Sequence, residues 1–380
     1  MLAVVCLVGL VGPILAVPQQ WHLPVVLGEL VAGVALGRTG LGYLDAGDQT
    51  FTFLGQIGFA LVMFVAGTHV PVRDPRLRPA LRTGLVRAAA VGVVAAGLGL
   101  LVAALVGTSH APLYAVLMAS SSAALALPVM DSLRLEGPPV LSVTTQIAIA
   151  DAASIVLLPL VINPGQAQRA ALGALAIAGS AVVLFFALRA GNRRGYRQRL
   201  HRYSHKRGLA LELRISLIIL FGLCAMAVAT HVSIMLAGFA LGLVLSAIGE
   251  PRRLARQLFG ITEGFLGPLF FVWLGASLQV RELGEHPALI LLGLGLGVGA
   301  LLAHGVGRLF GQPITLAVLS AAQLGVPVAA ATLGTEQHLL APGEPSALML
   351  GAVVTVATTA IAGAMAARRQ TAEEASTPAE

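Results

Sequence analysis

Long apolar runs separated by short polar loops dominate the whole sequence. About twenty apolar residues are enough for a helix to cross the hydrocarbon core of a membrane. Thirteen runs are long enough to do so: about 1–17, 23–37, 51–69, 83–107, 111–130, 139–162, 170–188, 210–230, 232–248, 261–279, 287–309, 313–333 and 345–367. The pattern therefore predicts an all-α polytopic membrane protein with about thirteen transmembrane helices.

The composition agrees with a membrane protein and excludes a water-soluble domain of this size. Of the 380 residues, 57% are hydrophobic and only 11% are charged, while the formal net charge is +7. The basic residues lie in short loops between apolar runs, where they direct membrane topology, so we expect the lipid bilayer and no nucleic acid as a partner. Cys6 and Cys224 both fall within apolar runs and are too few for a disulfide framework.

The basic residues are divided unevenly between the two sides of the membrane. One set of loops, the arginine-rich face, holds 18 of the 24: Arg73, Arg76, Arg78, Arg82, Arg134, the eight basic residues from Arg189 to Arg207, Arg252, Arg253, Arg256, Arg368 and Arg369. The other loops, the arginine-poor face, hold Arg38, Arg169 and Arg281. By the positive-inside rule the arginine-rich face is cytoplasmic, with the N-terminus outside and the C-terminus in the cytoplasm.

A single carboxylate stands in the middle of the run 139–162. This residue, Asp151, is the thirteenth of 24 residues that are otherwise almost wholly apolar. Placing a charged Asp at the centre of a membrane helix costs about 2.5–3.5 kcal/mol, and such residues mark ion or proton pathways. We therefore expect Asp151 to be an ion and proton site. The alternative is an acid that only ties helices together through hydrogen bonds.

Two runs are interrupted at corresponding places in the two halves of the chain. Ser120, Ser121 and Ser122 break the first run, and the segment Gln323-Leu324-Gly325-Val326-Pro327 breaks the second. Paired broken helices are typical of transporters built from inverted repeats, which bind their substrate where the helices cross. Freed carbonyls and hydroxyls there can coordinate a small cation. Alternatively, these residues only kink packed helices.

The longest loop divides the chain into two membrane halves. We expect an N-terminal half at 1–188 with the first break and Asp151, and a C-terminal half at 210–367 with the second break. Residues 189–209 form a basic cytoplasmic linker between them, and the polar residues 368–380 form a disordered cytoplasmic tail.

Several segments resemble, in the expected order, the monovalent cation:proton antiporters of the Kef and Nha type. They are PVVLGELVAGVALGRTGLG (24–42), FLGQIGFALVMFVAGTHV (53–70), LMASSSAALALPVMDSL (117–133), HVSIMLAGFALGLVLSAIGEPRRL (231–254) and FLGPLFFVWLGASLQV (265–280). The resemblance implies a core domain with two crossing discontinuous helices, a dimerisation domain, an elevator-like mechanism of alternating access and a homodimer in a bacterial inner membrane. By position, Asp151 would bind cation and proton in turn, beside the three serines. We expect no C-terminal nucleotide-binding domain of the Kef kind.

The chain departs from the family pattern at the residues around the acid. Family members often have an acid, Asn or Gln directly before the essential Asp, where this chain has Ala150. A Lys that often pairs with the acid is also missing, because the only Lys is Lys206 in the linker. His304 or Arg308 would then be the basic partner. His304 is alternatively a pH sensor or a packing residue, and Arg308 a residue that reaches the headgroups.

These observations predict exchange of Na+ or K+ for H+, without a cofactor and without enzymatic activity. Burial disfavours a charged carboxyl group and a nearby cation favours it, so one acid can hold either ion but hardly both. One acid trading one proton for one monovalent cation is electroneutral. Glu29 and Glu263 could line an ion funnel, or be ordinary interfacial acids. The alternative functions are a sodium symporter for an organic anion, and a cation channel or nontransporting sensor subunit.

Overall fold

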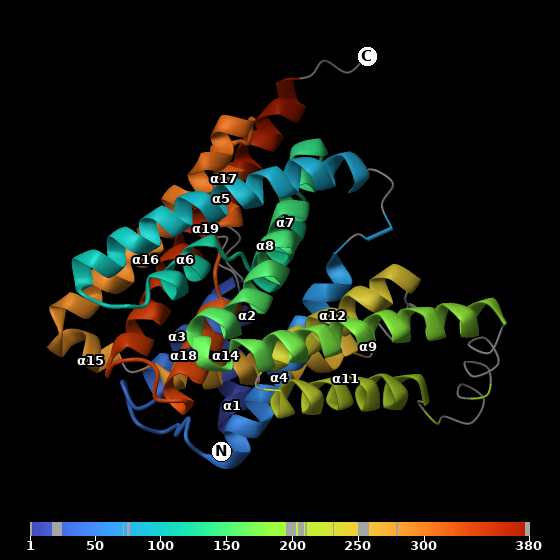
Figure 1. Cartoon of the computed structure of the whole chain (residues 1–380), viewed down its shortest axis with the longest axis horizontal. Helices are drawn as coiled ribbons and strands as arrows, with labels where there is room; N and C mark the ends of the chain where they lie inside the picture. The colour runs from blue at the N-terminus through green and yellow to red at the C-terminus, as the bar shows by residue number, and fades with distance from the viewer. Residues whose placement is uncertain are drawn as a thin grey trace.

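The computed structural model describes residues 2–16, 25–70, 72–73, 77–194, 203, 209, 211–230, 232–249, 258–278 and 280–376. Over these ranges the regular structure is helical (Figure 1). Nine described helical stretches are long and apolar enough to cross a membrane, and two shorter apolar stretches cover 111–127 and 234–248. Each of the thirteen predicted runs coincides with a helix or a pair of helices, which confirms the predicted fold class.

The N-terminal half contains α1 (Leu2–Gly9), α2 (Val11–Ala16), α3 (Val25–Leu36), α4 (Gln49–His69), α5 (Leu77–Val106), α6 (Ala111–Ala119), α7 (Ala123–Ser132), α8 (Pro138–Ile162), a short 3-10 helix at Pro164–Gln166 and α9 (Ala167–Arg193). The C-terminal half contains α11 (Leu211–Ala229), α12 (Ile234–Ile248), a π-helical turn at Thr262–Leu266, α14 (Gly267–Ser277), α15 (Val280–Glu285), α16 (Pro287–Gly305), a 3-10 turn at Val306–Phe310, α17 (Ile314–Ser320), α18 (Gly325–Glu336) and α19 (Glu344–Ser376).

Helix ends differ from the prediction at the linker and at the tail. Helix α9 continues to Arg193, and most of the remaining linker lies outside the described residues. Helix α19 continues to Ser376, through most of the range for which we expected a disordered tail. The residues that extend it include several strong helix formers, namely Ala, Arg, Gln and Glu, which explains why the helix does not end with the apolar run.

The helices form two packed groups. In the first, which we call the core group, α5 packs against α6 and α8, and α16 and α19 pack against each other and on the second broken helix. In the second, the scaffold group, α4 packs against α12 and α14, and α3 against α14. Figure 1 shows α5, α16, α17 and α19 gathered on one side and α4, α9, α11 and α12 on the other. Helix α8 packs against α5 of the core group and also contacts α12 of the scaffold group, so it joins the two groups.

Close helix packing in the scaffold group depends on glycine. A side chain at Gly67 or Gly242 would meet the backbone of the opposing helix, and so would one at Gly238. Small residues let helix backbones approach closely in membranes, where van der Waals contact is a main source of association. The α4–α12 pair is therefore held at a fixed distance beside the core group.

Candidate functional site

The first break follows directly from the three serines. Helix α6 ends at Ala119, the backbone of Ser120 is extended, and α7 begins at Ala123. All three serines are buried. Serine side chains compete with helical backbone bonding, and here the Ser120 hydroxyl donates a hydrogen bond to the carbonyl of Leu117 at 2.7 Å. The break thus exposes backbone groups in the middle of the core group rather than at a surface.

Asp151 lies halfway along α8 and faces this break. Its side chain is only 2% exposed, and its Oδ2 accepts a hydrogen bond from the backbone N–H of Ala123 at 2.9 Å. Ala123 is the first residue of α7, so the carboxylate lies at a helix N-terminus, where the helix dipole favours negative charge. The position is suited to an acid that alternates between a charged and a neutral state.

The second break meets the first in the core. Helix α17 ends at Ser320 and α18 begins at Gly325. The Ser121 hydroxyl donates to the carbonyl of Ser320 at 2.6 Å, and the Gln323 Nε2 donates to the carbonyl of Leu117, also at 2.6 Å. Two segments about 200 residues apart in the sequence are therefore joined by side chain to backbone hydrogen bonds. This is the crossing that the paired interruptions predicted.

Gly325 and Pro327 shape the start of α18. A Cβ at Gly325 would lie 2.7 Å from the Met235 sulfur on α12, so a larger residue here would require the flexible Met235 side chain to move. Pro327 is the third residue of α18, within the first helical turn, where a missing backbone N–H costs no helical hydrogen bond. Both residues serve the geometry of the break.

A threonine on α19 holds the second break and was not predicted from the sequence. Thr355 is fully buried, and its Oγ1 accepts a hydrogen bond from the backbone N–H of Gln323 at 3.2 Å. The same hydroxyl donates to the carbonyl of Ala352 at 2.8 Å. A lone threonine in an apolar run usually satisfies its own helix, so the sequence carried no signal for this contact.

His304 contacts the second break. It is fully buried on α16, and its Nδ1 lies 3.0 Å from the Ser320 Oγ. Gln146 of α8, also missed in the sequence, donates from Nε2 to the same oxygen at 3.4 Å. Among the described contacts none links His304 to Asp151, and Arg308 is exposed in the turn after α16. A basic-partner role for either residue stays a prediction.

The two predicted funnel acids lie in the scaffold group. Glu29 is buried on α3 with its side chain against Gly12, whereas Glu263 is exposed in the π-helical turn before α14. The structure does not bring them to the crossing, and their funnel role stays a prediction.

Beside the contacts at the crossing, the Ser122 Oγ of the first break and the Gln146 Oε1 of α8 are buried oxygens without a hydrogen-bond partner among the described residues. Within the described parts of the chain no three His, Cys, Asp or Glu side chains cluster as a metal site. A cation at the crossing would therefore be held by one carboxylate together with hydroxyl, amide and carbonyl oxygens, the ligands that hard cations prefer.

Known proteins are similar to this chain over most of its length. The family described as "Sodium/hydrogen exchanger, transmembrane" matches residues 2–368. The "Putative Na(+)/H(+) antiporter YjbQ" of Bacillus subtilis is 24% identical over 93% of this chain and 60% of its own length. The "Glutathione-regulated potassium-efflux system protein KefC" of Salmonella typhi is 27% identical over 93% of this chain and 58% of its own. This chain thus spans about three fifths of these two relatives.

The fold is also similar to solved structures. The sodium proton antiporter MjNhaP1 from Methanocaldococcus jannaschii, solved at pH 8, has a TM-score of 0.65 at 17% identity, with 97% of each chain covered. A second structure of MjNhaP1, from an electron-microscopy map, has a TM-score of 0.68 at 16% identity and covers 99% of this chain and 98% of that one. The family match over almost the whole chain shows that this protein belongs to the transmembrane sodium/hydrogen exchanger family, whose members are transporters and not enzymes.

Proposed function

We propose that this protein exchanges a monovalent cation, Na+ or K+, for H+, and that Asp151 binds the two ions in turn. The observation that carries the proposal is the buried Asp151 carboxylate at the N-terminus of α7, beside the crossing of two broken helices. The family and the names of the relatives, which include Na+/H+ and potassium-efflux proteins, support this class of transport.

The chemistry follows from one acid in a water-poor site. The Ala123 N–H and the α7 dipole stabilise the charged form, which a cation needs, while burial favours the protonated form when the cation leaves. Ser122 and the carbonyls freed at the breaks supply further oxygen ligands. If the site changes the side to which it opens only when Asp151 carries a proton or a cation, one proton moves for one monovalent cation. The exchange is then electroneutral.

The proposal includes how the protein moves and sits in the membrane. The core group would move against the scaffold group, so that the crossing opens to each side in turn. The scaffold group would form a homodimer in a bacterial inner membrane. The arginine-rich face would be cytoplasmic, with the N-terminus outside and the C-terminus inside, because basic loops remain on the cytoplasmic side.

The test is the collapse of an imposed pH gradient in liposomes containing the purified protein. We expect Na+ or K+ to collapse the gradient with wild-type protein without generating a membrane potential, and Asp151→Asn to remove this response. Asp45→Asn is the matched control, because Asp45 is exposed at the arginine-poor face in an ion pair with Arg38. An Asp151→Asn protein as active as wild type would refute the proposal.

The same liposomes separate the other candidate functions. Sodium-dependent uptake of an organic solute without proton exchange would identify a symporter. Cation currents that need no proton gradient would identify a channel. Titration with Li+, Na+, K+ and Rb+ under a fixed pH gradient would then determine which cation is the substrate.

A further inference from the structure

A buried arginine connects three parts of the core group. Arg87 lies on α5 inside a membrane span, yet it is only 6% exposed. Its Nη1 donates a hydrogen bond to the Ser142 hydroxyl at 2.9 Å, and its Nη2 donates to the carbonyl of Phe310, also at 2.9 Å. Ionisable residues inside membrane spans are costly and commonly functional. Arg87 is therefore a candidate for a role in transport that the sequence pattern did not reveal.

The Arg87 guanidinium lies on the arginine-rich side of the crossing. Long side chains on a helix lean toward its N-terminus, and α5 begins at the arginine-rich face. Both acceptors are at the same end of the core group. Ser142 is the fifth residue of α8, and Phe310 ends the 3-10 turn between α16 and α17.

Each acceptor begins a stretch of chain that leads to the crossing. From Ser142, helix α8 continues one turn to Gln146 and then to Asp151. From Phe310, the chain enters α17, which ends at Ser320 in the second break. The Gln146 Nε2 donates to the Ser320 Oγ at 3.4 Å, so the two stretches meet there. By holding the start of both stretches, Arg87 fixes the separation of α8 and α17.

The contacts around Arg87 are short. A Cβ at Gly84, one turn before Arg87, would lie 3.0 Å from the backbone nitrogen of Gln146, so α5 and α8 are in close contact. The Ser142 hydroxyl that accepts from Arg87 also donates to the carbonyl of Pro139 at 2.9 Å, which fixes its direction. The planar guanidinium holds its acceptors in a rigid geometry. A change at Arg87 is therefore transmitted to both helices.

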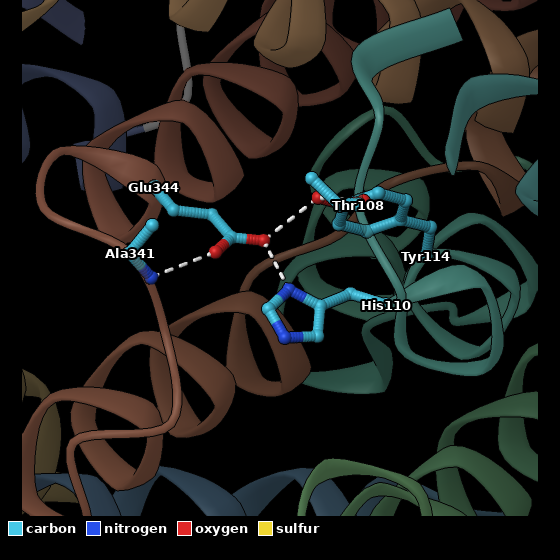
Figure 2. A network of polar contacts seen from close by, with 5 residues as sticks. All are labelled: Thr108, His110, Tyr114, Ala341 and Glu344. Atoms are coloured by element: carbon cyan, nitrogen blue, oxygen red, sulfur yellow. Dashed lines mark hydrogen bonds and ion pairs between the residues drawn. The ribbon is translucent and has the colours of Figure 1, made fainter. Parts of the chain in front are cut away.

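The opposite end of the core group is connected in a different way. Figure 2 shows the Glu344 carboxylate, whose Oε1 accepts a hydrogen bond from the Tyr114 hydroxyl at 2.7 Å and lies 2.7 Å from His110 Nδ1. These contacts hold the start of α6 to the start of α19 and involve neither α8 nor α17. The Arg87 contacts, in contrast, act on the helix that carries Asp151.

We propose that Arg87 is a positioning residue that fixes the width of the cation site between α8 and α17, and thereby sets the preference among monovalent cations. The inference rests on the proposed function, in which Asp151 and the carbonyls freed at the second break bind the same cation. Selectivity among cations of equal charge depends on the size and rigidity of the oxygen cavity. A proton needs only the Asp151 carboxylate, so Arg87 affects which cation is exchanged rather than whether a proton is.

The first experiment measures proton-coupled exchange in liposomes with Na+ and with Rb+, for wild type and Arg87→Met. Methionine is a long, unbranched side chain without the charge or the hydrogen bonds. The measured quantity is the Na+ concentration for half-maximal exchange divided by that for Rb+, which does not depend on the amount of active protein. We expect this ratio to rise several-fold, because a wider site loses more of its contact with the smaller ion.

Two further variants make this test specific. Arg82→Met is the matched control, because Arg82 is exposed on the same helix, and we expect its ratio to equal that of wild type. Ser142→Ala removes only one hydrogen bond of Arg87 and keeps the charge, so it still tests the proposal if Arg87→Met does not fold. We expect a smaller rise for Ser142→Ala, and no further rise when it is added to Arg87→Met.

The outcome that would overturn the proposal is a ratio that stays at the wild-type value, or falls, in the folded variants of Arg87 and Ser142. An equal rise in Arg82→Met would also overturn it, because loss of any arginine on α5 would then have the same effect.

The second experiment needs no transport. A cation that binds the folded protein raises its melting temperature, so titrations with Na+ and Rb+ in detergent at constant ionic strength give the same ratio from binding. If wild type binds cations but does not exchange them for protons, the proposed function fails, while a higher ratio in Arg87→Met still supports the inference. If wild type exchanges cations and Arg87→Met leaves the ratio unchanged, the inference fails and the proposed function stands. A wild type that neither binds nor transports these cations would refute both.

Discussion

In both halves of the core group, a backbone N–H at the helix break donates to an oxygen on the long helix that follows. In the first half Ala123 donates to the Asp151 carboxylate at 2.9 Å, and in the second half Gln323 donates to the Thr355 hydroxyl at 3.2 Å. The two halves thus share one construction, as expected of inverted repeats. They differ in the group that receives the hydrogen bond.

Under the proposed function, this difference gives the two halves different tasks. A carboxyl group can lose its proton and then attract a cation, whereas a threonine hydroxyl stays neutral under all conditions the protein meets. The proton of this hydroxyl is also already used, because it forms a hydrogen bond to the carbonyl of Ala352. We infer that the first half performs the exchange, while the second half fixes the geometry in which Asp151 works.

The largest expected effect comes from making the first half resemble the second. Asp151→Thr keeps an oxygen near the Ala123 N–H but removes the titratable group, so we expect proton-coupled cation exchange to fall to the level of empty liposomes. Thr355→Val leaves the Gln323 N–H without its acceptor, at a cost of about 1–3 kcal/mol, and should reduce the rate without abolishing it.

Thr355→Ser is the control for the second half, because it keeps the hydroxyl. We expect its rate and stability to stay close to wild type. The comparison between the halves fails if Asp151→Thr retains exchange, or if Thr355→Val abolishes exchange in protein that is still folded by gel filtration and circular dichroism.

A smaller effect on stability is expected at two buried glutamines, of which one has a described hydrogen bond and the other has none. Gln323 donates to the carbonyl of Leu117 across the crossing, whereas neither amide atom of Gln312 has a partner among the described residues. Gln323→Leu should lower the free energy of unfolding by about 1 kcal/mol, because a hydrogen bond is lost. Gln312→Leu should leave it unchanged or raise it, because an unsatisfied buried group is removed.

Thermal unfolding in detergent measures this difference. The two variants make the same chemical change at sites that are equally buried. Any general effect of replacing glutamine by leucine therefore cancels in the difference between their unfolding temperatures. Equal losses of stability would show that the hydrogen bond from Gln323 does not hold the two breaks together.

The sequence was sufficient for the spans, the two breaks and the position of Asp151. Each of these depends on local pattern: run length, serine and proline within an apolar run, and a carboxylate at a depth where it is costly. The sequence also predicted that the two breaks meet, because paired interruptions in two halves imply a crossing.

The contacts at the crossing could not be predicted in the same way. Which residue His304 faces depends on the rotation of α16, and the structure places its Nδ1 on the Ser320 Oγ. Thr355 and Gln146 looked like ordinary polar residues of packed helices. The His110–Glu344 pair joins residues 234 apart in the sequence, a distance at which no local pattern applies.

The smallest expected effect separates neighbouring serines within the first break. The Ser121 hydroxyl donates to the carbonyl of Ser320, while the Ser122 Oγ is buried without a partner among the described residues. Ser121→Ala should therefore lower the free energy of unfolding by about 1 kcal/mol and leave the cation dependence of exchange unchanged. Ser122→Ala breaks no described hydrogen bond. If its oxygen binds the cation beside Asp151, stability will be preserved and the cation concentration for half-maximal exchange will rise several-fold. An unchanged concentration would remove Ser122 from the proposed ligands and leave Asp151 with backbone carbonyls, so the first break would then resemble the second in everything except its acid.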